Sequence, residues 1–307
     1  MHLEIFKVFC DVVETGSFSR AASKNLLTQS AVSQQIRSLE AHYNRQLVER
    51  SRGRIRLTQA GEALYQVGKQ ISQKYRQIEE ELQALSHTVA GSVRVNTVYS
   101  VGLYELSAPL KHYLQTFPEV EVHLEYTRVN KIYEDVSRGD IDLGIVAYPT
   151  KRSQIVVTPF REDRLVLVCA PQHPFAALSS LPMKSLDREK FVGFERDIPT
   201  RRALDRIFRQ HHVRVQYTTE VDNIETVKRI VELGSSLAIV PEPSIVQEVQ
   251  NNTLKVIPFV DEVVMRPLGI ISKRGRRFTP AVQEFVRFLQ SESRSTTRPT
   301  PALRATS

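Results

Sequence analysis

The 307-residue sequence predicts an α/β fold in three consecutive parts: a small helical unit with a β-hairpin, a long helix, and a two-lobed α/β domain. Three observations predict this order. Short amphipathic helical segments and an arginine-rich hairpin pattern fill the first 58 residues. One helical pattern then continues for about 30 residues, and from residue 92 strand and helix patterns alternate. Such alternation is typical of a largely parallel sheet.

Composition excludes several classes of protein. The hydrophobic fraction of 41% is ordinary for a globular chain, and no apolar run approaches the roughly 20 residues of a membrane span. Acidic residues interrupt the apolar N-terminus, unlike in a signal peptide, so we expect a cytoplasmic protein with no membrane partner. Cys10 and Cys169 lie far apart in apolar stretches, which favours buried thiols over a disulfide framework or a metal site.

The net charge of +8 is unevenly distributed. Residues 1–58 carry +4, residues 59–271 carry −2 and residues 272–307 carry +6. More than half of the excess therefore lies at the C-terminus, where residues 291–307 have the composition of a disordered basic tail. The high charge alone is weak support for nucleic-acid binding.

The N-terminal unit begins with an amphipathic helix from Leu3 to about Val13, which Gly16 is suited to end. A second helix starts after a cap at Ser17 or Ser19 and carries two small residues for close packing. We expect Leu26 and Leu27 to close this small core.

The next helix, predicted over residues 30–43, has two distinct faces. One apolar stripe should face the core: Val32, Ile36, Leu39 and Tyr43. Hydrogen-bonding side chains gather on the opposite face: Ser30, Ser33, Gln34 and Arg37. Gln and Arg can make paired hydrogen bonds to purine edges in the major groove, and Ser reaches bases or phosphates.

A turn of only a few residues precedes this helix, which starts at Thr28 or Gln29. That spacing is typical of a helix-turn-helix, in which the second helix enters the DNA groove. Gln29, at the start of the helix, is a further candidate for DNA contact. A solvated helix face that contacts nothing is the alternative interpretation.

A β-hairpin is predicted after this helix, with its turn at Arg52-Gly53 and arginines alternating with apolar residues. Arg52 and Arg54 should lie against DNA phosphates or in the adjacent minor groove, which would add salt-dependent affinity. The alternative is a solvated basic turn.

A long helix follows, with Thr58 as its cap and an end near His87. Its apolar positions follow the steps of a coiled-coil seam, with Gly68 at one missing position: Leu64, Ile71, Tyr75, Ile78, Leu82, Leu85 and Val89. One narrow stripe cannot stabilise so long a helix alone, so we expect a second copy of the chain to pair with it. Packing of the stripe on its own chain is the alternative.

These motifs carry a resemblance to a known family. The segments GSFSRAA, QSAVSQQIRSLE and RIRLTQAG resemble the N-terminal winged helix-turn-helix of LysR-type transcriptional regulators, and the rest, up to about residue 290, is similar to their effector-binding domain. The resemblance implies an α/β protein with a winged helix-turn-helix, a long linker helix and a C-terminal two-lobed domain like type 2 periplasmic binding proteins. It also implies a homodimer or homotetramer that binds promoter DNA, a small-molecule effector and RNA polymerase.

The resemblance divides the chain into residues 1–58 for DNA binding, residues 59–89 for the linker (dimerisation) helix and residues 92–290 for effector binding. Lobe I should comprise about 92–160 and 266–290, and lobe II about 163–265.

Matched by position, Ser100 and Thr200 correspond to hydroxyl residues of the family's effector site. Ile198-Pro199 replace the usual Ser-Gly before Thr200, and Ser236 stands where a second glycine is frequent. The pocket is therefore expected to differ in shape.

The residues themselves support an anionic effector. Ser100, Thr200 and Asn223 lie at predicted helix starts, where unpaired N–H groups and the helix dipole favour an anion. Guanidinium groups for carboxylate or phosphate contacts come from nearby positions: Arg128, Arg196 and Arg201. Ser, Thr and Asn at helix starts are, however, as often simple caps.

Catalytic motifs are missing from the sequence. It has no P-loop, no HExxH and no Gly-x-Ser-x-Gly, and the adjacent His211 and His212 cannot share a helix face. We therefore predict no enzymatic activity, no cofactor and no metal site. Two other hypotheses stay open: a solute-binding module, which the basic hairpin disfavours, and an architectural DNA binder, which the two-lobed domain disfavours.

Overall fold

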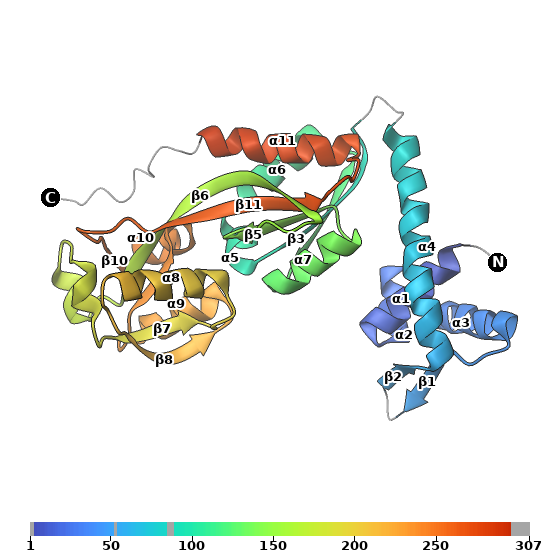
Figure 1. Ribbon diagram of the computed structural model, residues 1–307, viewed down its shortest axis with the longest axis horizontal. Helices are drawn as coiled ribbons and strands as arrows, with labels where there is room; N and C mark the ends of the chain where they lie inside the picture. The colour runs from blue at the N-terminus through green and yellow to red at the C-terminus, as the bar shows by residue number, and fades with distance from the viewer. Residues whose placement is uncertain (1–2, 52–53, 85–88, 296–307) are drawn as a thin grey trace. The chain divides into compact units, whose positions relative to one another are not determined.

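The computed structural model describes residues 3–51, 54–84 and 89–295, and the chain forms two compact units, Met1–His87 and Thr88–Ser307. The first unit contains α1 (Glu4–Thr15), α2 (Phe18–Lys24), α3 (Gln29–Tyr43), β1 (Val48–Ser51), β2 (Arg54–Leu57) and α4 (Gln59–Ala84) (Figure 1). The helix-turn-helix, the hairpin and the long helix thus belong to one unit.

Local signals end and start these helices where the sequence predicted. Gly16 ends α1 in the left-handed region, at φ 60°. Ser17 caps α2 by accepting a hydrogen bond from the Arg20 N–H, and Thr28 caps α3 by accepting one from the Ala31 N–H at 3.2 Å. The Thr58 hydroxyl accepts from the Gly61 N–H at 3.0 Å at the start of α4.

The core of the first unit joins all four helices to the hairpin. Its fully buried side chains include Phe9, Val12, Ala21, Val32 and Leu39. The prediction that Leu26 and Leu27 close this core is wrong. Leu26 is 96% exposed and Leu27 37% exposed, because the turn between α2 and α3 turns outward with Leu26 at φ 54°.

The apolar stripe of α4 divides into two halves. Leu64 and Ile71 pack on the core of their own unit, as the alternative interpretation held for the whole stripe. Further along, Tyr75, Ile78 and Leu82 are 37%, 56% and 64% exposed. Leu85 lies outside the described residues, and Val89 packs in the core of the second unit instead of continuing the helix.

The second unit is built on a seven-stranded sheet in two lobes. The first lobe contains β3 (Gly91–Thr97), α5 (Tyr99–Tyr104), α6 (Ser107–Thr116), β4 (Val120–Tyr126), α7 (Val129–Arg138), β5 (Leu143–Ala147) and α11 (Pro280–Ser295). The second contains β7 (Lys190–Phe194), α8 (Pro199–Gln210), β8 (Gln216–Val221), α9 (Ile224–Glu232), β9 (Ala238–Pro241), α10 (Val246–Gln250) and β10 (Lys255–Ile257). Short 3-10 helices cover Pro174–Ala177, Met183–Leu186 and Glu242–Ile245.

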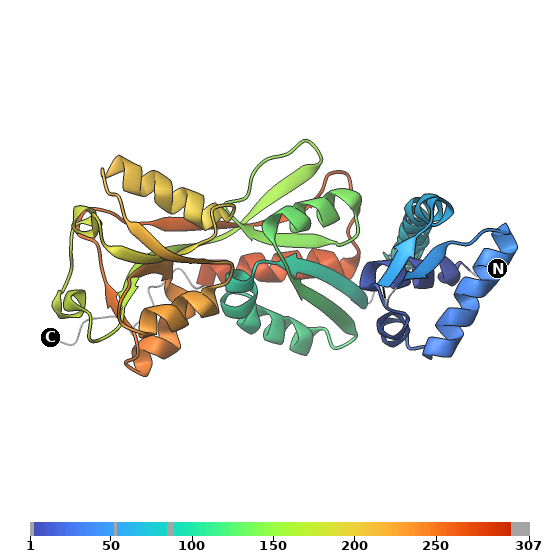
Figure 2. The ribbon, with the colours of Figure 1, turned by 90° about the horizontal axis from the view of Figure 1, so that it is seen from below.

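Two long antiparallel strands, β6 (Ile155–Cys169) and β11 (Met265–Lys273), connect the lobes. Figure 1 and Figure 2 show them side by side in both views. The sheet is consequently mixed and not largely parallel as predicted. Strands β3, β4 and β5 are parallel, whereas β9, β10 and β11 each pair antiparallel with β6.

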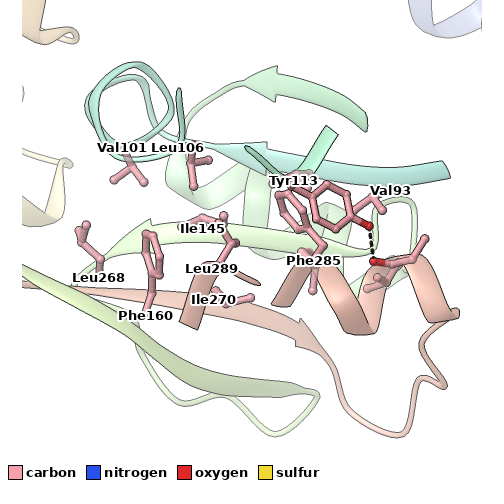
Figure 3. Close-up of a cluster of buried hydrophobic side chains, with 14 of the residues drawn as sticks. Val93, Val101, Leu106, Tyr113, Ile145, Phe160, Leu268, Ile270, Phe285 and Leu289 are labelled. Carbon is pink, nitrogen blue, oxygen red and sulfur yellow. Dashed lines mark hydrogen bonds between the residues drawn. The ribbon is translucent and has the colours of Figure 1, made fainter. Parts of the chain in front are cut away.

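Each lobe has its own core. In the first, Tyr113 lies beside Phe285, with ring centroids 5.0 Å apart, and its hydroxyl donates to the Ala281 carbonyl at 2.7 Å (Figure 3). This bond ties α6 to α11. In the second, Phe191 and Phe208 pack edge to face.

Two expectations about helix ends need correction. The sequence pattern from Val101 to Phe117 predicts one helix, but the structure has two, α5 and α6, which are interrupted at Glu105 and Leu106. Residues 291–295, predicted as part of a disordered tail, continue α11, and residues 296–307 lie outside the described residues. Among the helices that the structure describes, none has both the length and the apolarity needed to cross a membrane.

Candidate functional site

Four of the α3 side chains predicted to read DNA are exposed: Gln29 at the first position of the helix, and Ser30, Gln34 and Arg37 on its outer face. Val32, Ile36 and Leu39 on the opposite face are buried, which fixes the rotation of the helix. A band of hydrogen-bonding groups with no apolar interruption is therefore available to a groove.

Ser33 does not belong to that outer face, and its predicted orientation is wrong. It is 5% exposed, and its hydroxyl accepts a hydrogen bond from the side-chain amide of Gln29 at 3.0 Å. Position 33 follows the buried Val32 by about 100° of helix rotation, which is near enough to the stripe to be covered. For Tyr43 the predicted burial is wrong in the opposite sense. It was expected in the core, but it is 41% exposed.

Both strands of the predicted hairpin are present. Strands β1 and β2 are antiparallel, with Val48 opposite Leu57 and Ser51 opposite Arg54. Arg54 thus stands at the end of the ladder. The predicted turn at Arg52-Gly53 lies outside the described residues.

A pocket that is open to solvent lies between the two lobes of the second unit, and the space inside it, open solvent included, is about 790 Å³. Three helices of nine residues or more begin at it, since residues at the starts of α7, α8 and α9 line the wall. The lining side chains are Val98, Tyr99, Ser100, Thr127, Arg128, Val129, Asn130, Ala147, Phe194, Asp197, Ile198, Pro199, Thr200, Asp222, Asn223, Ile224 and Arg266.

Four of the five predicted effector residues line this pocket: Ser100, Arg128, Thr200 and Asn223. Thr200 is 4% exposed and is the second residue of α8. Asn223 also caps α9, because its side-chain oxygen accepts from the Thr226 N–H at 2.9 Å. Asn223 therefore both caps α9 and lines the pocket.

Arg201, the fifth, does not line the pocket. It is 4% exposed, and its guanidinium donates to Asp205 at 2.9 Å and to Glu220 at 3.0 Å while lying over the Tyr217 ring. Burial lowers the pKa of Arg201, but the hydrogen bonds that its guanidinium donates to Asp205 and Glu220 outweigh this effect, so that the pKa is raised. Arg196 is also outside the lining and pairs with Glu220 at 3.5 Å.

Arg266 is a pocket residue that the sequence analysis missed. Its guanidinium donates to the Ser100 hydroxyl at 2.9 Å and to Asp163 at 2.8 Å. An arginine inside a strand of buried residues was the available signal, since such a charge needs a partner. Tyr99, Asp197 and Asp222 were missed as well.

The replacement of Ser-Gly by Ile198-Pro199 changes the wall at α8. Both residues line the pocket, and Pro199 occupies the first position of the helix, where it has no N–H to offer a ligand. Ser236 is 3% exposed and lies outside the lining, with its hydroxyl 3.4 Å from that of Thr218.

The described residues contain no group of three or more His, Cys, Asp and Glu side chains arranged to hold a metal ion. Cys10 and Cys169 are both buried.

Two protein families match this chain. The bacterial regulatory helix-turn-helix protein family, lysR type, matches residues 3–62, and the LysR substrate binding domain matches residues 86–294. A probable RuBisCO transcriptional regulator of Cyanidioschyzon merolae is 29% identical over 289 residues, which cover 92% of this chain and 95% of the relative.

Two solved structures are similar in fold. Full-length CbnR complexed with its target DNA aligns with a TM-score of 0.70 and 18% identity, covering 95% of this chain and all of CbnR. The regulatory domain of Synechocystis PCC6803 CcmR in complex with 2-PG aligns with a TM-score of 0.62 and 23% identity, covering 67% of this chain and 99% of that domain.

Proposed function

The chain belongs to the LysR family of DNA-binding transcriptional regulators, and from this premise we propose that α3 and the β1–β2 hairpin read a promoter while an anionic effector in the pocket controls that binding. The family consists of regulators and not of enzymes. The observation that carries the DNA-reading proposal is the exposed polar band of α3, held by a buried stripe on its other side. Gln34 and Arg37 are exposed, and the planar end of each side chain can make two hydrogen bonds to one base edge.

An anionic effector is supported by the starts of α7, α8 and α9 at the pocket. The first N–H groups of a helix have no partner within it, and the helix dipole adds partial positive charge there. The Ser100 hydroxyl and the Arg128 guanidinium supply further donors on the wall. The similar CcmR domain was solved in complex with 2-PG, which supports a small molecule as the effector of this chain.

A homo-oligomer is part of this proposal. Ile78 and Leu82 are more than half exposed on α4, and a second copy of the chain offers the matching stripe. Two copies would present two α3 helices to a site with two-fold symmetry. A regulator bound at a promoter would contact RNA polymerase there. Both would be in the cytoplasm, where the promoter lies.

Footprinting on genomic fragments selected by the purified protein tests this function. We expect protection of one dyad-symmetric site per promoter. Broad protection without a dyad would contradict it and favour the architectural alternative. A thermal-shift screen tests the effector, and stabilisation only by compounds without an anionic group would contradict an anionic effector.

A further inference from the structure

The four charged residues that line the pocket are sorted by lobe. Arg128 belongs to the first lobe, at the start of α7, and Arg266 lies near the start of β11, which runs between the lobes and pairs with β5 of the first lobe. Asp197 and Asp222 belong to the second, in the loops that precede α8 and α9. One wall of the pocket is therefore lined by guanidinium groups and the facing wall by carboxylates.

The charge of Arg266 is already compensated within the protein. Arg266 is 2% exposed and Asp163 5% exposed, and the guanidinium uses two of its nitrogens on that carboxylate. Its third nitrogen donates to Ser100 at 2.9 Å. A ligand thus meets Arg266 as part of a neutral pair and not as an open positive charge.

The charge of Arg128 is also compensated, chiefly by Glu195, which does not line the pocket. Its guanidinium lies 2.9 Å from Glu195, which is a good hydrogen-bond distance, but 3.5 Å from Asp197 and 3.6 Å from Asp222. The latter two carboxylates are about half exposed and are only loosely held by the arginine. Asp222 Oδ1 also accepts a hydrogen bond from the Asn223 side-chain amide at 3.0 Å, and both carboxylates line the pocket.

Counted with their partners, the charged groups at the pocket are two guanidinium groups and four carboxylates. If a simple anion bound to Arg128, the arginine could no longer compensate the charges of Asp197 and Asp222. The anion would then lie close to two carboxylates. Like charges at this range repel, more so in a cleft that excludes part of the water. A ligand that brings its own positive charge to the second wall avoids this cost.

We propose that the effector carries a cationic group as well as an anionic one. The acid lies toward Arg128 and Ser100 on the first lobe, and an amine lies toward Asp197 and Asp222 on the second. This rests on the proposed effector function of the pocket and narrows the ligand to a class, that of amino acids and other compounds with both charges.

Matched pairs of compounds that differ in one amine test the proposal on the full-length protein. The pairs are L-glutamate with glutarate and L-phenylalanine with 3-phenylpropionate, assayed by thermal shift and titration calorimetry. Three proteins are compared: the wild type, the double variant Asp197→Asn/Asp222→Asn, and the control Glu119→Gln/Glu121→Gln. The control removes the same charge from exposed residues at the start of β4.

We expect the amino member of at least one pair to bind the wild type about five- to tenfold more tightly than its deaminated partner. This preference should disappear or reverse in Asp197→Asn/Asp222→Asn and persist in the control. Equal binding of both members to the wild type, or a preference that survives the double variant, would overturn the inference while leaving an anion-binding pocket intact. Absence of binding by every acid in the panel would count against both the inference and the proposed effector site.

Discussion

Arg266 and Asp163 face each other across β11 and β6, with the Arg266 Nε 2.8 Å from the Asp163 Oδ1, at the place where the two strands pass between the lobes. Both side chains are nearly inaccessible to solvent, at 2% and 3%. Such a pair stabilises a fold little compared with an apolar substitute, but the loss of one partner leaves a buried charge alone.

The variant Asp163→Asn should therefore lower the free energy of unfolding of the second unit by about 3–5 kcal/mol. Glu284→Gln, which breaks the exposed pair with Arg287 on α11, is the control and should cost about 0–1 kcal/mol. Urea unfolding followed by circular dichroism measures both. Equal small losses would mean that water reaches Arg266 and solvates it.

The elements of this fold could be predicted because periodicity and end signals are local. Gly16, Thr28 and Thr58 act on residues within one turn of themselves, and the structure has them where the sequence predicted. The mixed sheet could not be predicted in the same way. The direction of β11 depends on pairing with β6, whose residues lie about a hundred positions earlier in the chain.

The candidate functional site could likewise be predicted only in part from the sequence. Ser33 is at the border of a buried stripe, and its burial depends on the Gln29 amide that covers it. Arg201 is adjacent to the pocket residue Thr200, but one helix step turns it toward Glu220 on β8, which the sequence alone does not bring near. The role of Arg266 required knowing that Asp163 and Ser100 both meet it.

Replacement of Gln34 by Ala tests the reading face of α3. If its amide pairs with a base, affinity for the selected site should fall by roughly 1–3 kcal/mol, and affinity for random duplex should change little. Arg54→Ala should instead weaken both and reduce the slope of affinity against salt. Fluorescence anisotropy at several salt concentrations separates the two effects. An equal loss on both duplexes for Gln34→Ala would rule out base reading by this residue.

The double variant Ile78→Asp/Leu82→Asp tests pairing through α4. These side chains are 56% and 64% exposed, so charge there should dissociate the oligomer while the core of the first unit keeps its melting temperature. Leu64→Asp is the contrasting variant, since Leu64 packs on that core and its replacement should lower the melting temperature. Sedimentation velocity and thermal melting give both readouts. An unchanged sedimentation coefficient for the double variant would place the oligomer contact elsewhere.

Gly61 and Gly68 both lie in α4, yet substitution by Ala should act in opposite directions. A Cβ on Gly61 would stand 2.0 Å from the Leu47 carbonyl oxygen, and this backbone atom also accepts from the Thr58 N–H at 3.1 Å. The strand leading into the hairpin cannot move away without breaking that bond. A Cβ on Gly68 would meet the Cys10 Sγ at 3.4 Å, an ordinary contact.

We therefore expect Gly61→Ala to destabilise the first unit by more than about 2 kcal/mol, through overpacking and the lost hydrogen bond. Gly68→Ala should be neutral or stabilise it by up to about 1 kcal/mol, because Ala is the better helix former. Thermal unfolding of the two variants compares them directly. A melting temperature for Gly61→Ala at or above that of Gly68→Ala would mean that the start of α4 and the hairpin are not held together by this close approach.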